Sequence, residues 1–354
     1  MKHSIVEIIA HLNQSLARDF RVTPLYAPDA PIFMAVAWPT GDRVTGCKPR
    51  LPAGRGMTLA QAMRSAGAEA IELRASLAQN HRAQMATLAV TDGRAMVPAH
   101  DLLTGAATQV PAQLVYLDHA LVSGEPLYAD ADSTGCATGD SRADATLAAL
   151  LECLERDAMA LWWHGMLPAA ALPLDLIDAL QPRLFWWLQE RPRQTRLLNL
   201  GTDTGVTVVA AISADPDGYD IATGTAARLT APEAALAAMT EMLQTEAAMA
   251  QAAAVADPDY LQWRDHACTR TMTQFRTSGS KPAPQATDQS TILQTLAALG
   301  HRALIVDLTL PDDPQPTVRV LIPGLCAMHG RLQNPRFRRL TGRDIPEYLS
   351  IEPF

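Results

Sequence analysis

The chain has 354 residues, of which 48% are hydrophobic and 19% are charged, and its formal net charge at pH 7 is −8. This length suits one large domain or two closely joined ones, and the apolar content is enough for a sizeable core. The acidic balance excludes a sequence-independent grip on phosphate backbones, which needs a basic face, so we expect no nucleic-acid partner.

We expect neither a membrane-spanning helix nor a signal peptide. No apolar run reaches about 18 residues, the length that a membrane-spanning helix needs. The first 20 residues predict an amphipathic helix instead of a signal peptide, because Glu7 and His11 interrupt the apolar run. The five cysteines are widely spaced and form no C-x-x-C pair, so we expect neither a disulfide framework nor a zinc site, and a cytoplasmic location.

The predicted elements alternate between short strands and long helices. A strand is expected at residues 33–38, and a helix begins after Thr58, which is a suitable amino-terminal cap. Further on, the sequence predicts strands at 87–90, 113–117 and 206–212, helices at 143–164 and 232–254, a mobile loop at 277–289, and a final helix at 291–299 with strands at 303–308 and 317–322. This mixture of strands and long helices indicates an α+β fold.

Acidic residues fall in a pattern on the first of these helices. Ser65, Glu69 and Glu72 follow i, i+4, i+7 spacing, so one hydroxyl and two carboxylates share a helix face. These side chains are expected to project together.

A second acidic group lies on the helix at 143–164 and its approach. At 100° per residue, its four acids fall within about a third of the helix circumference, and Arg156 borders them. The four are Asp140, Asp144, Glu152 and Glu155. Most intervening residues are apolar, which predicts a largely buried helix, and buried carboxylates cost several kcal/mol each unless a counter-ion offsets them.

One arginine does not balance four acids, so the second group indicates a bound divalent cation. With oxygen ligands and no histidine in the group, Mg²⁺ is preferred over zinc. Mg²⁺ held by carboxylates usually keeps coordination positions open for phosphate oxygens, so a nucleoside triphosphate is the expected ligand. Spacing alone also fits solvated acids on exposed helix faces, and it does not show that the two helices meet.

The acids lie in the first two of four motifs that resemble those of the YcaO family. GRGMT at 54–58, followed by Ser65, Glu69 and Glu72, is similar to G-K-G-x-[T/S] and S-A-x-x-E-x-x-E. DSTGCATGD at 132–140 with ECLERDA at 152–158, TEMLQ at 240–244, and VDLT at 306–309 with VRVLIPGL at 318–325 are similar to the family's other three. The motifs occur in the family's order and extend over most of the chain.

The resemblance implies a YcaO-type fold of mixed, largely antiparallel sheets packed with long helices, in a single domain over residues 1–354 with no fused partner or leader-binding domain. It implies an enzyme that uses ATP and Mg²⁺ to activate peptide backbone amides by phosphorylation, forming azolines from Cys, Ser or Thr of a ribosomally made precursor. Thioamide or amidine formation is the enzymatic alternative, and a scaffold with a decayed nucleotide site is the non-catalytic one.

By position, the resemblance assigns nucleotide binding to residues of the first two motifs. We add Arg319, which lies in a predicted apolar strand and is expected either to reach a phosphate or to cap the sheet edge. The nucleotide-binding candidates are Ser65, Glu69, Glu72, Asp140, Asp144, Glu152, Glu155, Arg156 and Arg319; the metal candidates are Glu69, Glu72, Asp144, Glu152 and Glu155. No catalytic residue is assigned. Asp140 and Asp144 replace the family's Asn and Glu, and Ala237 replaces an Arg for which Arg228 is a candidate substitute.

The resemblance also implies partners: the precursor peptide and a separate protein of the ubiquitin-activating-enzyme-like or TfuA type. It leaves a homodimer open. Five arginines form a basic run that predicts either a solvated loop or a docking site for an acidic leader peptide; they are Arg331, Arg336, Arg338, Arg339 and Arg343. The tryptophan pairs at 162–163 and 186–187 are expected to anchor packing.

Overall fold

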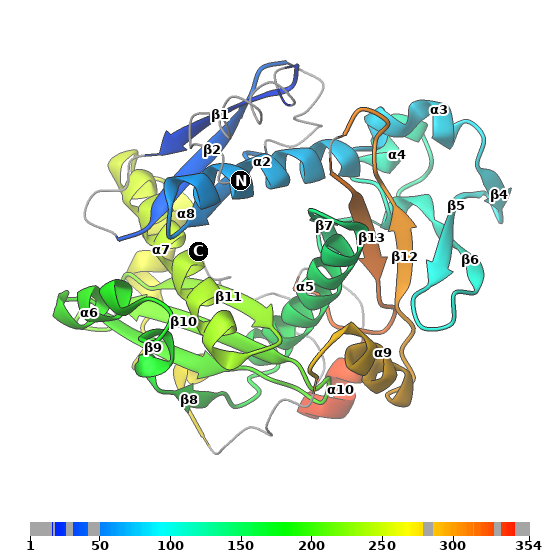
Figure 1. Ribbon diagram of the computed structural model, residues 1–354. Coiled ribbons are helices and arrows are strands. Elements are labelled where there is room, and N and C mark those ends of the chain that lie inside the picture. Colours follow the sequence, from blue (N-terminus) through cyan, green and yellow to red (C-terminus); the bar gives the residue numbers. More distant parts are fainter. Residues whose placement is uncertain are drawn as a thin grey trace. The chain divides into compact units, whose positions relative to one another are not determined.

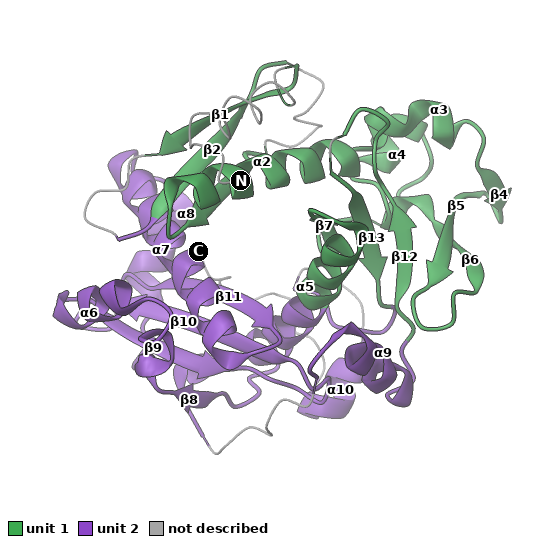
Figure 2. Ribbon diagram, in the orientation of Figure 1, with its two compact units in different colours: residues 1–28, 33–153, 302–322 green, residues 29–32, 154–301, 323–354 purple. Residues whose placement is uncertain are grey.

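The computed structural model describes residues 16, 18–25, 31–41, 50–129, 131–278, 286–313, 315–328 and 334–343. Most of the predicted amino-terminal helix, and residues 279–285 of the predicted mobile loop, lie outside the described residues. The chain forms two compact units (Figure 2): the first contains 1–28, 33–153 and 302–322, and the second contains 29–32, 154–301 and 323–354. Helix α5 (Arg142–Trp163) begins in the first unit and ends in the second.

In the first unit, helix α2 (Leu59–Ser76) packs on a three-stranded antiparallel sheet of β1 (Phe20–Leu25), β2 (Phe33–Pro39) and β3 (Ala53–Gly56) (Figure 1). The predicted cap is confirmed, because the Thr58 side chain accepts a hydrogen bond from the Gln61 backbone N–H in a capping box. Gly54 allows the close approach of β3 to α2, since a Cβ there would lie 2.1 Å from the Ala66 nitrogen.

The second sheet of this unit contains β7, the strand next to the acidic residues of α2 and α5. Its path is β4 (Ala89–Thr91), β5 (Arg94–Asp101), β12 (Leu304–Asp307), β13 (Thr317–Leu321) and β7 (Cys136–Thr138), and β6 (Ala107–Pro111) pairs with β5. Short helices α3 (Arg82–Met85) and α4 (His119–Ser123) and the 3-10 turn η1 (Ala78–His81) lie outside the sheets. Strand β13 therefore has a neighbour on each side.

The strand predicted at 113–117 is wrong. The segment forms the 3-10 turn η2 (Ala112–Leu114), in which the Ala112 carbonyl accepts the N–H groups of Val115 and Tyr116. Both of those side chains are buried, and a short buried apolar run does not distinguish a strand from a turn by periodicity.

In the second unit, helix α7 (Ala231–Ala254) packs on a sheet ordered β11 (Ala222–Arg228), β10 (Thr207–Ala214), β9 (Gln194–Asn199) and β8 (Ala170–Leu172). Close packing requires a glycine, because a Cβ on Gly224 would lie 2.2 Å from the Met242 nitrogen. The remaining elements are α6 (Pro182–Glu190), α8 (Pro258–His266), α9 (Gln289–Ala298), α10 (Pro335–Thr341), η3 (Leu174–Ile177) and η4 (Thr273–Phe275).

The predicted fold class is confirmed, since long helices pack on sheets whose named strands all pair antiparallel. Trp162 and Trp163 are buried against Phe275, as expected of packing anchors. Trp186 differs from the prediction: it is 60% exposed, because α6 buries Leu184 and Leu188 instead. Among the described helices, none has the length and hydropathy to cross a membrane.

Candidate active site

Glu72 is the centre of an acidic group in the first unit. Its side chain on α2 is half-buried and accepts a hydrogen bond from the backbone of Thr138 on β7. Burial, followed by the carboxylates of Glu69 and Glu152, raises the pKa of Glu72 well above its ordinary value. Glu152 lies on α5, so the acids that the spacing placed on two helices meet within this unit.

Glu152 is oriented by a loop that requires a glycine. Its Oε2 accepts the Gly135 backbone N–H at 3.1 Å, and the Gly135 carbonyl accepts the Val320 N–H at 2.7 Å. Gly135 has φ +78°, and a Cβ there would lie 2.2 Å from the Val320 oxygen. A side chain at this position would displace the donor that holds Glu152.

Arg319 lies on β13 with 3% of its surface exposed. Its Nη1 donates to the Asp132 carbonyl at 2.6 Å and to Cys136 Sγ at 3.3 Å. Because β13 lies between β12 and β7, the side chain does not cap a sheet edge. Burial raises the pKa of the Cys136 thiol, which suits packing better than nucleophilic attack.

The remaining α2 candidate, Ser65, is half-buried, and a Cβ on Gly54 would come within 2.7 Å of its carbonyl carbon. Ser65 therefore lies where β3 crosses α2. The GRGMT motif and the hydroxyl thus belong to one local packing arrangement.

Asp140 and Asp144 lie at the exposed amino-terminal end of α5. Asp144 Oδ2 accepts the Ser141 hydroxyl at 2.7 Å, and Ser141 Oγ accepts the Asp144 backbone N–H at 3.1 Å, so this pair caps the helix. Asp140 accepts the Gln315 side-chain amide at 2.8 Å. Since a helix rises 1.5 Å per residue, Asp144 precedes Glu152 by about 12 Å along the axis. Nucleotide roles for both aspartates, and a metal role for Asp144, stay predictions.

Glu155 belongs to the second unit and is 7% exposed. Its oxygens accept the Thr225 hydroxyl at 2.8 Å and the Ala227 N–H at 3.0 Å, both from β11. Burial raises the pKa of Glu155; Arg156 lowers it and Glu241 raises it. Residue-level prediction missed Glu241, although the TEMLQ motif on α7 contained it.

Arg228, the proposed substitute for the missing arginine, is exposed at the end of β11. Its Nη1 donates to the Ala227 carbonyl at 2.7 Å, on the residue whose N–H binds Glu155. A phosphate-binding role for Arg228 stays a prediction.

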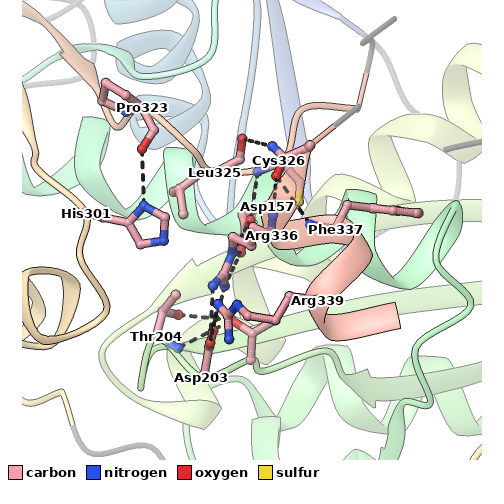
Figure 3. Close-up of polar contacts among 12 residues, drawn as sticks. Asp157, Asp203, Thr204, His301, Pro323, Leu325, Cys326, Arg336, Phe337 and Arg339 are labelled. Atoms are coloured by element: carbon pink, nitrogen blue, oxygen red, sulfur yellow. Dashed lines mark hydrogen bonds and ion pairs between the residues drawn. The ribbon is translucent and has the colours of Figure 1, made fainter. Parts of the chain in front are cut away.

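The basic run does not form a solvated loop throughout. Arg336 on α10 is 4% exposed and donates to both Asp157 oxygens through Nε, at 2.9 and 3.2 Å, while its Nη2 lies 2.6 Å from Asp203 (Figure 3). Asp157, fully buried on α5, also accepts the Cys326 N–H at 2.9 Å. Arg336 is therefore structural, because a buried guanidinium needs paired carboxylates. Arg338 and Arg339 are exposed, and Arg331 lies outside the described residues.

The expected Mg²⁺ needs oxygen donors, which the glutamates of the first unit supply. Over the parts of the chain that are described, no three His, Cys, Asp or Glu side chains already lie close enough to hold a metal ion. Mg²⁺ needs no such cage, since one or two carboxylates with water and substrate phosphates complete its octahedral shell. A cation beside Glu72 would offset its burial and the repulsion from Glu69 and Glu152. The residues of the first unit therefore fit Mg²⁺.

The chain thus has an α+β fold in which glutamates from α2 and α5 come together, and a family model covers the chain from just after α2. Residues 78–326 match the model described as YcaO cyclodehydratase, ATP- and Mg²⁺-binding. The chain belongs to the YcaO family. The expected family and its ATP and Mg²⁺ cofactors are thereby confirmed at the level of the family.

Solved structures share the fold at low sequence identity. A heterocyclase in complex with substrate and cofactor has a TM-score of 0.77 and 20% identity; the match covers 99% of this chain and 57% of the heterocyclase. YcaO from Methanopyrus kandleri, bound with AMPPCP and Mg²⁺, has a TM-score of 0.66 and 22% identity over 90% of both chains. The E. coli microcin synthetase McbBCD complex has a TM-score of 0.65 and 14% identity, and the match covers 86% of both chains. No curated protein matched the chain.

Proposed function

We propose that the chain is a YcaO cyclodehydratase subunit that activates backbone amides of a precursor peptide with ATP and forms azolines from Cys, Ser or Thr residues. The observation that carries this proposal is that burial of Glu72, together with the charges of Glu69 and Glu152, makes ionisation of the Glu72 carboxyl unfavourable without a cation. The family match supplies the reaction class, and the similarity to a heterocyclase with bound substrate supports a peptide substrate.

In this proposal Glu69, Glu72 and Glu152 hold Mg²⁺, which when bound offsets charge on the transferring phosphoryl group. The Gly135 N–H keeps Glu152 turned toward the site, and the Thr138 N–H does the same for Glu72. Ser65, Arg156 and Arg319 are proposed nucleotide contacts, together with Asp140, Asp144 and Glu155. The exposed Asp140 and Asp144 would need a contact other than the one that each makes in the structure.

The proposed reaction removes one water from the peptide. The side-chain thiol or hydroxyl adds to the preceding amide carbonyl, and the resulting oxygen attacks the γ-phosphorus of ATP, breaking its bond to ADP. Phosphate then leaves with the former amide oxygen as the C=N bond forms and the nitrogen loses its proton. Phosphorylation is needed because an amide oxygen is a poor leaving group, and positioned cations supply most of the stabilisation in such transfers.

The proposed assembly is a single YcaO domain, in the cytoplasm, that works with a separate ubiquitin-activating-enzyme-like or TfuA-type protein. The similarity to the McbBCD complex supports a partner without specifying its type. The exposed Arg338 and Arg339 of α10 remain candidates for contacting an acidic leader peptide.

Mass spectrometry of the precursor peptide after incubation with the chain, its partner and ATP tests the proposal. Azoline formation predicts a loss of 18 Da per ring together with ADP and phosphate release, about one each per ring. An oxygen-to-sulfur exchange would assign thioamide formation instead, and unchanged mass with no ATP binding would assign a scaffold. Glu152→Gln should lower turnover by about 100-fold or more, whereas the matched exposed control Glu190→Gln on α6 should leave it unchanged.

A further inference from the structure

Arg74 lies near the carboxyl end of α2, two residues after Glu72, with 11% of its side chain exposed. Because two residues turn an α-helix by about 200°, Arg74 leaves the side of α2 opposite Glu72. Its Nη1 donates to Asp19 Oδ2 at 2.7 Å, and its Nη2 pairs with Asp313 Oδ1. Two ion pairs therefore fix α2 on the side opposite Glu72.

Asp313 depends strongly on this pairing. Its side chain is 1% exposed in the loop between β12 and β13, and burial raises its pKa while Arg74 lowers it. Its other oxygen, Oδ2, has no hydrogen-bond partner among the residues that the structure describes. Removal of Arg74 would leave a buried carboxylate poorly compensated.

Asp313 is also connected to Glu72 through strands β13 and β7. Asp313 precedes Thr317 of β13 by four residues, Thr317 pairs with Thr138 of β7, and their hydroxyls lie 2.8 Å apart. The Thr138 backbone is the hydrogen-bond donor to Glu72. The sheet that orients Glu72 on one side of α2 is thus tied to the other side of α2 by Arg74.

We propose that Arg74 is a positioning residue that fixes the rotation of α2 and its distance from β7, so that Glu69 and Glu72 face Glu152. This inference rests on the proposed function, because that function assigns Mg²⁺ binding to the three glutamates. In this proposal Arg74 acts through Glu69 and Glu72 and does not itself bind the nucleotide. Residues that orient ligands from outside a metal site affect affinity by about 10- to 100-fold.

Two readouts test the inference on the full chain. Calorimetry with Mg²⁺ and AMPPCP should show affinity about 10- to 100-fold lower for Arg74→Gln, and amide exchange in the ligand-free chain should be faster at Thr138. Arg74→Lys should recover part of the affinity, because the ammonium still pairs with one aspartate. The exposed control Arg82→Gln on α3 should change neither readout.

A second variant separates positioning from general destabilisation. Arg74→Gln combined with Asp313→Asn removes the uncompensated charge while keeping the side-chain shape, so this chain should fold and still bind AMPPCP weakly. Wild-type affinity in a folded Arg74→Gln chain or in the double variant overturns the inference alone. Absence of Mg²⁺-AMPPCP binding by the unaltered chain overturns the proposed function and the inference together.

Discussion

The carboxylate of Glu152 on α5 raises the pKa of Glu72 on α2, although the two residues are far apart in the sequence. Each glutamate accepts a backbone N–H from the segment around β7, Glu152 from Gly135 and Glu72 from Thr138. The site is thus arranged before any cation binds, and in the ligand-free protein burial and then like-charge repulsion disfavour the ionised form of Glu72.

Glu152→Gln should lower ATP turnover by about 100-fold or more, because it removes charge that holds the cation but leaves an oxygen to accept the Gly135 N–H. Stability of the ligand-free chain should stay the same or rise. Phosphate release and urea unfolding measure the two effects. A variant that is as active as the unaltered chain would remove Glu152 from the site.

Glu155→Gln should stabilise the ligand-free chain at pH 8. Burial raises the pKa of Glu155 in the folded state, so ionisation is disfavoured there and the penalty is fully present only above the folded pKa. Below the ordinary pKa of glutamic acid both chains are neutral at this position, and their urea midpoints should converge. A midpoint gap that stays constant with pH would contradict this explanation.

Asp101 should contribute stability that is lost in acid. Its carboxyl accepts Arg302 Nε at 2.8 Å and the Thr104 N–H at 3.0 Å, and these contacts lower its pKa from 3.8 to about 2. The contribution is present above about pH 4 and disappears as the pH falls through about 2. The advantage of the unaltered chain over Asp101→Asn in urea unfolding should therefore shrink between pH 5 and pH 2.

Arg336→Met should destabilise the fold by about 3–5 kcal/mol, because it leaves the fully buried Asp157 without its guanidinium. Arg338→Met, on the exposed side of the same helix, is the matched control and should have little effect. Denaturant unfolding compares the two. Equal stability of both variants would show that the buried pair contributes nothing.

Gly54→Ala should destabilise the first unit by about 1–3 kcal/mol or more, because the new methyl group overlaps the Ala66 nitrogen of α2. In the control Gly41→Ala, the new methyl group would meet no described residue within 4 Å. Thermal unfolding should separate the two variants, and identical midpoints would mean that β3 can move away from α2 without cost.

The sequence predicted well the helix starts and helices that depend on residues close together in the chain. Thr58 begins α2 because its partner Gln61 lies within the same turn, and the α5 and α7 helices follow from their composition. Spacing grouped Asp144 with Glu152 and Glu155, but it did not predict that Asp144 also pairs with the adjacent Ser141 as a helix cap; its metal role stays a prediction. Arg336 was unpredictable, because Asp157 and Asp203 are 179 and 133 residues away along the chain.

Titration of the ligand-free chain with ATP, with and without Mg²⁺, tests the magnesium role of the three glutamates most directly. We expect ATP to bind tightly only when Mg²⁺ is present, and Glu72→Gln to lose that dependence together with most of the affinity. Equal binding without Mg²⁺, or an unchanged Mg²⁺ dependence in Glu72→Gln, would contradict it.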